Sequence, residues 1–446
     1  MSVLEEHPTV RKYRAQSTAT TDSLLSPLDT EWLKTVCVEA GADDAGFVRV
    51  NHPDLSADRE SIQKYIPWTR SLIAFVCKMN REPIRNPARS IANLEFHHQG
   101  NHVNEVASRI VHKLEELGIR AINPSMGFPM EMDNFPGKIW IISHKLVAVA
   151  AGLGKMGIHR NVIHPRFGNF ILLGTIAVDR ELDNYSQALD YNPCLECKLC
   201  VSACPVGAIG SNGEFNFSAC YNHNYKEFMG GFTNWVEIIA GSKNIKGYRE
   251  QVKDSETASQ WQSLSYGANY KAAYCMGVCP AGEDVISPFL EDRSAYVKNI
   301  VKPLQQKQEP VYVVKDSDAE THVRKRFPHK TLRIVKNGLR PDSLDTFIPG
   351  MRLTFQPEQS KNLNAVYHFT FTGAQQGQVT IMIKDKTLNV VDGHHHQADL
   401  AVRVDSQFWI AFLRKEKNIV IGLLTGKIRL TGNPSLLLKF GKCFPN

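Results

Sequence analysis

The sequence predicts a mixed fold of the α+β or α/β class, divided into several domains. Helix-like and strand-like segments alternate between residues 31 and 185, cysteines concentrate between residues 186 and 300, and residues 339–446 again combine strands with helices. A chain of 446 residues is long for one core, so about two to four domains are expected. We expect residues 1–30 to form a flexible lead and the polar residues 301–338 to form a linker.

Composition argues against several classes of protein. The chain has 52 Lys and Arg against 45 Asp and Glu, and a net charge of +7 does not by itself indicate nucleic-acid binding. No run approaches the ~20 apolar residues of a membrane span, and the polar N-terminal sequence has no signal-peptide pattern. We therefore expect a cytoplasmic protein without a membrane span. Cys37, Cys77 and Cys443 stand alone and are expected to be buried thiols.

The region 31–185 is expected to combine an amphipathic helix with buried strands. Residues 101–117 place apolar side chains on one helical stripe, and Gly118 is a natural end for that helix. Residues 71–76 (SLIAFV) and 169–178 (NFILLGTIAV) are typical of buried strands. The helical stripe consists of Val103, Val106, Ile110, Leu114 and Leu117.

The strongest functional signal is the run C-L-E-C-K-L-C-V-S-A-C-P at residues 194–205, which has the cysteine spacing of bacterial ferredoxins. Two-residue gaps let three thiolates converge on one iron–sulfur cluster, and the fourth cysteine normally ligates a neighbouring cluster. A zinc site or a disulfide framework is the alternative, but zinc sites rarely use this triple spacing. The seven predicted ligands are Cys194, Cys197, Cys200, Cys204, Cys220, Cys275 and Cys279.

The ferredoxin crossover divides these cysteines unequally. The first cluster takes Cys279 together with the first three cysteines of the run, which leaves Cys204, Cys220 and Cys275 for the second. A three-iron cluster, a four-iron cluster with an open site and a four-iron cluster completed by another ligand all remain open. The non-cysteine side chains nearby in sequence are His223, Tyr270 and Tyr274.

Residues 339–446 are expected to form a separate small domain. Apolar side chains alternate along two neighbouring strands that meet at a turn near Asp385, and Asp405 is placed to cap a following helix. The high apolar content either fills a core or lines a cavity. The alternating residues are Tyr367, Phe369, Phe371, Val379, Ile381 and Ile383.

A glycine-dense segment, residues 151–168 (AGLGKMGIHRNVIHPRFG), precedes the second buried strand. Alone, it indicates close backbone approach to a ligand or tight packing. Followed by that strand and by both cysteine motifs, it resembles epoxyqueuosine reductase and the reductive dehalogenases over roughly residues 40–285. The resemblance implies a nitroreductase-like core that holds a base-off cobalamin, with two iron–sulfur clusters supplying electrons.

By this resemblance, the corrinoid would be lined by Gly152, Gly154, Met156, Gly157 and His159. Two positions depart from the family pattern. Ala272 stands where the second motif normally begins with a cysteine, and Asn123 with Pro124 stands where epoxyqueuosine reductase has a proton-donating aspartate. Glu131 and Asp133 are the nearest candidate acids, with an exposed loop carboxylate as the alternative.

Residues 339–446 resemble the sterol carrier protein 2 (SCP2) family at residues 355–358 (FQPE), 365–373 (AVYHFTFTG) and 425–440 (TGKIRLTGNPSLLLKF). That family implies a sheet with helices around an apolar tunnel for a lipid or acyl ligand, and an assembly role is the alternative. Epoxyqueuosine reductase carries helical repeats behind its clusters that help grip tRNA. Their replacement here argues against a tRNA substrate.

Together these features predict an iron–sulfur, corrinoid-dependent reductase. Two clusters would relay electrons from a low-potential donor such as ferredoxin or flavodoxin to cobalamin, which would reduce a small apolar or halogenated substrate. One alternative is an iron–sulfur electron-transfer protein that lacks the corrinoid. Another is a lipid-binding protein whose cluster domain senses redox state.

Overall fold

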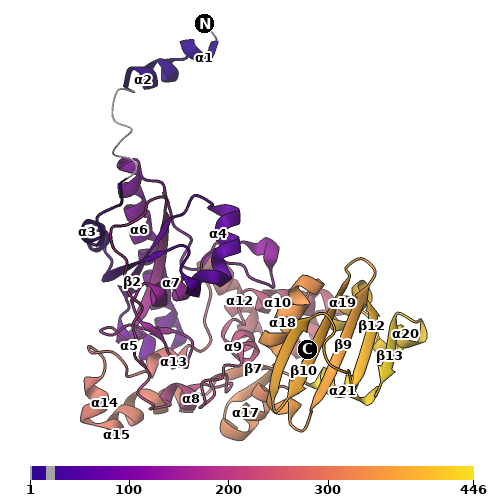
Figure 1. Cartoon of the computed structure of the whole chain (residues 1–446). Coiled ribbons are helices and arrows are strands. Elements are labelled where there is room, and N and C mark those ends of the chain that lie inside the picture. The colour runs from indigo at the N-terminus through magenta and orange to yellow at the C-terminus, as the bar shows by residue number, and fades with distance from the viewer. Residues whose placement is uncertain (1–2, 17–25, 446) are drawn as a thin grey trace.

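The computed structural model describes residues 3–16 and 26–445 and shows the chain as a succession of α+β units (Figure 1). The predicted fold class is confirmed. Within the predicted flexible lead, residues 3–16 form helices α1 (Val3–Glu6) and α2 (Pro8–Gln16). Residues 1–2 and 17–25 lie outside the described residues. No helix in the described part of the chain has the length and apolar character needed to cross a membrane.

The first unit is built on a four-stranded antiparallel sheet in the order β1-β2-β6-β3. Its strands are β1 (Asp44–Arg49), β2 (Ser71–Lys78), β3 (Ala121–Ile122) and β6 (Ile171–Val178). One face is covered by α3 (Thr30–Ala40) and α6 (Arg89–Glu116), and the other by η2 (Pro53–Asp58), α4 (Arg59–Tyr65) and α7 (His144–Ala150). Because β2 is covered on both faces, its continuous apolar run is buried as predicted.

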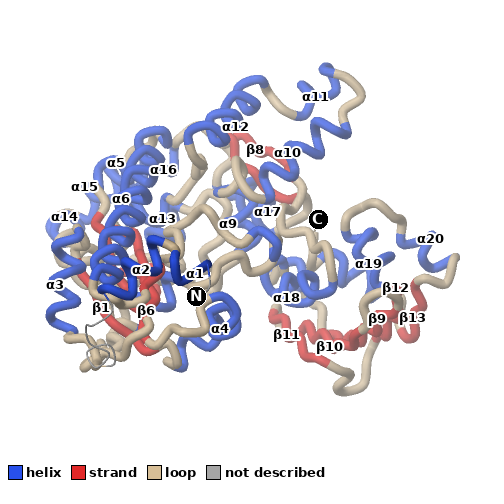
Figure 2. The backbone as a smooth tube through the Cα atoms, turned by 90° about the horizontal axis from the view of Figure 1, so that it is seen from above, coloured by secondary structure: helices blue, strands red, loops and turns tan. Residues whose placement is uncertain are grey.

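The second unit carries the cysteine motifs on short helices. These are α8 (Leu199–Ala203), α9 (Phe217–Asn224) and α13 (Tyr274–Gly277), followed by α14 (Ser287–Glu291), α15 (Arg293–Tyr296), η4 (Val297–Val301) and α16 (Lys302–Gln306). The long insertion between the motifs forms α10 (Gly230–Gly241), α11 (Ile245–Gln251) and α12 (Asp254–Tyr266). Figure 2 shows α10 and α11 projecting at one edge of the molecule.

Residues 301–338 differ from the linker that the sequence predicted, because most of them are folded. Strand β7 (Pro310–Val314), helix α17 (Asp318–Arg326) and strand β8 (Thr331–Val335) form a β-α-β unit with two parallel strands. Val311, Val313 and Val323 lie in the same apolar cluster as Cys200 and Cys204. This segment therefore completes the core of the cysteine-bearing unit.

The C-terminal unit is a five-stranded sheet in the order β11-β10-β9-β12-β13, in which only the β9–β12 pairing is parallel. Its strands are β9 (Ala365–Thr372), β10 (Gly377–Lys384), β11 (Thr387–Asp392), β12 (Leu400–Asp405) and β13 (Ile428–Gly432). Its helices are α18 (Leu344–Thr354), α19 (Ser406–Leu413), α20 (Ile419–Leu424) and α21 (Ser435–Lys442). The Asp405 side chain accepts a hydrogen bond from Phe408 N–H, which confirms the predicted cap.

Aromatic side chains pack against one another between this sheet and its helices. The ring of Phe369 contacts Phe371, Trp409 and Phe440, and Tyr367 also contacts Phe440. These rings are fully or almost fully buried. The apolar content noted in the sequence therefore lies in a packed core.

Polar contacts join the C-terminal unit to the cysteine-bearing unit. Gln356 Oε1 accepts hydrogen bonds from Asn216 Nδ2 (3.3 Å) and from Asp318 N–H (3.1 Å). Near the other end of this unit, Asn337 Nδ2 donates to the carbonyl of Pro445 at 3.2 Å. Helix α18 also lies against α9, the helix that carries Cys220, so the C-terminal unit supports the cysteine-bearing unit directly.

Candidate metal centre

Four separate segments supply the seven predicted ligands. The first three cysteines lie in a loop and the first turns of α8, Cys204 ends that helix, and Cys220 lies on α9. Cys275 lies on α13 and Cys279 follows it, and α13 packs against α8. The fold therefore brings together two motifs that are separated by the whole α9–α12 region.

The electrostatic interactions among the sulfur atoms show which cysteines lie near one another. Cys279 interacts with Cys197, Cys194 and Cys275. Cys200 interacts most strongly with Cys275, and then with Cys279 and Cys197. Cys204 interacts with both Cys220 and Cys275. The seven cysteines therefore form one neighbourhood, and their division into four and three remains a prediction from the crossover spacing.

Among the residues that the structure describes, no three Cys, His, Asp or Glu side chains are close enough to hold one metal ion together. A tetrahedral zinc site needs four such ligands on one ion, whereas a four-iron cube places each thiolate on a different iron. The assignment of iron–sulfur clusters rather than zinc rests on the cysteine spacing.

Backbone N–H groups surround several of the sulfurs. Ala208 N–H donates to Cys204 Sγ at 3.3 Å, and Ile158 N–H donates to Cys194 Sγ at 3.4 Å. Cys197 and Cys279 also receive backbone N–H donors, from Leu199 and Ala281. N–H donors favour the thiolate form, and hydrogen bonds to sulfur are one of the factors that set the potential of a bound cluster.

Burial keeps the free thiols protonated. It raises the pKa of Cys275 and of Cys279 to about 12, and it also raises the pKa of Cys204 and Cys220. Only deprotonated sulfur ligates iron, so iron binding must displace these protons and supply the positive charge that the apolar surroundings lack.

The glycine segment packs against protein atoms. A Cβ on Gly152 would lie 2.4 Å from the carbonyl oxygen of Gln187, and a Cβ on Gly154 would lie 2.5 Å from that of Ile163. A Cβ on Gly157 would lie 2.8 Å from Ile163 Cδ1. The structure therefore accounts for all three glycines by tight internal packing, so they do not fit a cradle for a corrinoid.

The same segment nevertheless contacts both groups of cysteines. Ile158 donates to Cys194 as described, and Asn161 Nδ2 lies 4.0 Å from Cys275 Sγ. Strands β4 (Lys155–Met156) and β5 (Val162–Ile163) form a small hairpin that holds these residues in place. Met156 lies on that hairpin and is half-buried. Sequence analysis selected the right segment but missed Ile158 and Asn161, the residues that reach the sulfurs.

His159 is a buried, neutral histidine. Its Nδ1 accepts the N–H of Asn161 at 3.1 Å, so the neutral ring must carry its proton on Nε2. Nε2 lies 3.0 Å from Asn169 Nδ2, and Asn169 Oδ1 is buried without a partner in the described structure. Turning the amide over places Oδ1 against the ring, where it accepts the Nε2 proton. Burial, reinforced by the charge of Lys145, lowers the pKa of His159 to about 4.

Lys145 is the cation nearest to the three-cysteine group on the side of the first unit. Its ammonium group donates to the carbonyl of Arg160 at 2.7 Å and to Asn161 Oδ1 at 3.1 Å, and it interacts with Cys220 and Cys275. Burial lowers the pKa of Lys145, yet its side chain keeps exposed surface.

Arg89 and Tyr225 also interact with Cys275. The Arg89 guanidinium stacks over the ring of Tyr274 at 5.3 Å and interacts with Cys275, while its Nε and Nη2 are buried without a partner in the described structure. Tyr225 interacts with Cys220 and Cys275, and burial raises its pKa. Ala272 contributes no ligand, and its N–H donates to Asn224 Oδ1 at 3.0 Å.

The candidate acids lie elsewhere. Glu131 precedes the short helix η3 (Met132–Asn134), and Asp133 is exposed on it. Neither carboxylate is among the groups that act on the cysteines in the described structure. Residues 121–126 occupy the place where epoxyqueuosine reductase has its aspartate. They contact His144 instead, whose Nε2 lies 2.9 Å from the carbonyl oxygen of Ser125.

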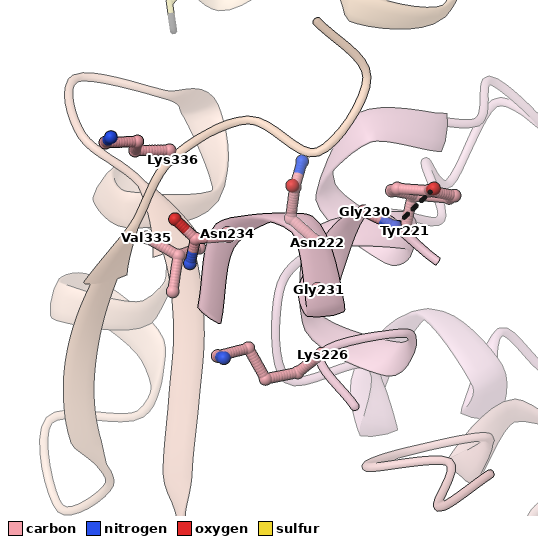
Figure 3. A pocket seen from close by; sticks show the side chains of 8 residues that line it. All are labelled: Tyr221, Asn222, Lys226, Gly230, Gly231, Asn234, Val335 and Lys336. Carbon is pink, nitrogen blue, oxygen red and sulfur yellow. Dashed lines mark hydrogen bonds between the residues drawn. The ribbon is translucent and has the colours of Figure 1, made fainter. Parts of the chain in front are cut away.

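A small hollow lies at the seam between α9, α10 and β8 (Figure 3). Lys226, Asn234 and Lys336 line it, and the Oδ1 atom of Asn234 is buried there without a partner. Its volume of about 10 Å³ is far below the ~300–1,000 Å³ of ordinary ligand pockets. We therefore do not assign a substrate to it.

Two family descriptions match parts of the chain. The SCP-2 sterol transfer family matches residues 353–445, and the 4Fe-4S binding domain matches residues 188–210. The second match covers the first four cysteines of the motif and supports an iron–sulfur assignment. The first matches the C-terminal unit.

The predicted resemblance to epoxyqueuosine reductase is confirmed. The chain is 25% identical to epoxyqueuosine reductase of Aliivibrio fischeri over 203 residues, which is 45% of this chain and 48% of the relative. It is 35% identical to that of Staphylococcus aureus over 80 residues, which is 18% of this chain and 20% of the relative. The chain thus spans about half or less of these relatives.

Solved structures give looser matches. The catabolic reductive dehalogenase NpRdhA matches 61% of this chain and 35% of its own, with a TM-score of 0.39 and 16% identity. An epoxyqueuosine reductase with an epoxyqueuosine-modified tRNA stem loop matches 67% of this chain and 81% of its own, with a TM-score of 0.35 and 15% identity. The prediction that tRNA is an unlikely substrate was wrong, because one of the matched epoxyqueuosine reductases is bound to a tRNA stem loop.

The first prediction concerns the cluster with three cysteines. Ala272→Cys adds the thiolate that the family pattern has at this position. If the second cluster holds three irons, iron content should rise from about seven to about eight atoms per chain. Iron analysis with electron paramagnetic resonance of anaerobically reconstituted protein measures this, with Ala273→Cys as the control. An unchanged iron content near eight in both proteins would show that four irons are already bound.

The second prediction tests the packing role of the glycines. Gly154→Ala should lower the free energy of unfolding by about 1–3 kcal/mol, because the new methyl group overlaps the Ile163 carbonyl and the Val162 side chain. Gly127→Ala is the control, since a Cβ there meets nothing within 4 Å. Denaturant unfolding measures both. A Gly154→Ala protein that is as stable as the wild type but loses cobalamin binding would restore the ligand-cradle interpretation.

The third prediction concerns acid. The folded protein holds His159 neutral with a pKa of about 4, below the usual 6.5, so protons bind preferentially to the unfolded chain. Stability should therefore fall as the pH drops from about 6.5 to about 4, by about 3 kcal/mol from this residue. Burial also lowers the pKa of His223, to about 4, and the pKa of His144 and His322, so His159→Gln should remove only part of the histidine-dependent slope. Denaturant unfolding of both proteins over this pH range measures the slope of unfolding free energy against pH.

Proposed function

We propose that this protein is an iron–sulfur oxidoreductase of the epoxyqueuosine reductase type. The observation that carries the proposal is that the fold brings seven buried or half-buried thiols from separate segments into one neighbourhood. When bound, two neighbouring iron–sulfur clusters would carry single electrons between the surface and the interior. The sequence relationship to epoxyqueuosine reductases supports the reaction class.

The chain's own residues would give the two groups different roles. Cys194 and Cys197 are half-buried and Arg293 acts on Cys197, so this group is suited to accept electrons from a low-potential donor. Cys220 and Cys275 are also half-buried, and they face Lys145. We propose that the acceptor binds beside these two sulfurs, at the exposed end of Lys145.

Lys145 would hold a negative group of the acceptor there. Its ammonium group is oriented by the Arg160 carbonyl and by Asn161 Oδ1, and it is desolvated, so its attraction for an anion is stronger than in water. Tyr225 lies beside the same two sulfurs with its phenol protonated. It is the nearest described candidate for a proton donor, a role for which Glu131 and Asp133 are poorly placed.

The identity of the acceptor has two candidates. Cobalamin is the one that the family resemblance implies, but the glycines predicted to cradle it face protein atoms instead. Its binding would therefore depend on the exposed end of Lys145, beside Cys220 and Cys275. The other candidate is a substrate or partner protein that takes electrons directly from the second cluster. An epoxyqueuosine-modified tRNA stem loop, which the matched structure holds, belongs among the substrates to be tested.

The fourth prediction tests the order of the two groups. Cys220→Ser should remove the second cluster, leave the first reducible by dithionite, and reduce turnover of the acceptor to the rate without protein. Anaerobic assays with and without added cobalamin, using the modified stem loop and a halogenated aromatic compound, identify the acceptor. Cys443→Ser is the control, because Cys443 is buried in the C-terminal core far from the sulfurs in sequence. Turnover that survives Cys220→Ser would contradict the proposed electron path.

A further inference from the structure

Helix α20 exposes an unusual amount of apolar surface. In the sequence Ile419–Leu424, Val420 is 55% exposed, Ile421 is 52% exposed and Leu424 is 83% exposed. Leu423 is exposed as well. Large apolar side chains that are exposed singly are ordinary, but four on one six-residue helix make a compact patch.

The packing of α20 explains why this patch faces outward. Asn418 caps the helix by accepting the N–H of Val420 at 2.8 Å. Gly422 is the buried contact with the domain, since a Cβ there would lie 2.4 Å from Phe408 Cε1 and 2.9 Å from Ile428 Cδ1. The face of the helix that carries Gly422 therefore packs against the C-terminal unit. The branched apolar side chains on the other faces are exposed to solvent.

A basic frame flanks the patch along the chain. It consists of Arg414, Lys415 and Lys417 before α20 and Lys427 after it, all exposed. Within residues 414–429 the only acidic side chain is Glu416. Arg414 pairs with Glu416 at 3.5 Å and Lys427 pairs with Asp405 at 3.7 Å, but both pairs are exposed and such pairs are weak.

An apolar helix inside a basic frame matches an anionic lipid surface. Such a surface receives apolar side chains to a depth of about 5–10 Å and attracts Lys and Arg through its acidic headgroups. A second copy of the chain is a poorer partner, because a symmetric contact through this patch would bring the two basic frames together. We propose that α20 and its basic frame dock the protein onto anionic lipid bilayers.

The position of α20 suits this role. Figures 1 and 2 both show α20 at one extreme of the molecule, with α14 and the N-terminal sheet at the opposite side. Docking through α20 would therefore leave the cysteine-bearing unit accessible to a donor and an acceptor. The inference concerns the C-terminal unit alone and does not depend on the proposed reductase activity.

Vesicle sedimentation of the full-length protein tests the proposal. The wild type should pellet with phosphatidylcholine vesicles that contain phosphatidylserine and should stay in solution with phosphatidylcholine alone. Each basic residue near an anionic bilayer contributes about fivefold to binding, so Lys417→Glu with Lys427→Glu should weaken binding at least tenfold. Val420→Gln with Leu424→Gln should weaken it to a similar or greater extent, and added salt should weaken binding of the wild type.

Leu290→Gln on α14 is the matched control, because Leu290 is 62% exposed but lies away from α20. It should pellet as the wild type does. All substituted side chains are exposed, and a thermal melt checks that each variant is folded. The proposal is overturned if the wild type stays in solution with anionic vesicles, pellets equally with neutral ones, or is unaffected by the Val420 and Leu424 changes. It is also overturned if those changes convert a stable dimer into a monomer without vesicles, since a second copy would then cover the patch.

Discussion

Removal of seven thiols from water is the constraint on which the rest of this structure depends. A buried thiol remains protonated and a buried thiolate needs compensating positive charge, so deprotonation of these sulfurs is favourable only when iron replaces the protons. Neighbouring elements therefore cover the sulfurs and keep water away from them. The β7-α17-β8 segment closes one side of the apolar cluster that contains Cys200 and Cys204. The C-terminal unit in turn lies against α9, which carries Cys220.

The glycine segment shows how one stretch of chain can serve both packing and chemistry. Its glycines allow the β4–β5 hairpin and its flanks to approach neighbouring backbone closely. This close approach delivers Ile158 N–H to one sulfur and the Asn161 amide to another. The segment thus connects the first unit to both cysteine groups. A ligand is not required to explain why glycine stands at these positions.

Features with a short repeat or a fixed spacing could be predicted from the sequence. The cysteine spacing, the buried strand β2 and the Asp405 cap each depend on neighbouring residues, and the structure has all three arrangements. Features that depend on distant contacts could not. The polar composition of residues 301–338 conceals a β-α-β unit, whose few apolar side chains, such as Val311 and Val323, are buried against the cysteine-bearing unit. Helix α6 begins at Arg89 because Asn93 and Glu95 find partners at Tyr270 and Asn80. Lys145 likewise gains its role only when the fold places it opposite Cys220 and Cys275.

The missing cysteine at Ala272 changes the electrostatics of the second group. A three-thiolate group carries less negative charge than a four-thiolate group, yet it is flanked by the cations Lys145 and Arg89. Arg89 has two buried N–H groups without a partner in the described structure, and such groups are costly unless an acceptor satisfies them. Sulfide or thiolate of a bound cluster would be such an acceptor. Two cations beside three thiolates would raise the reduction potential of this group above that of the first, which favours electron flow from the first group to the second.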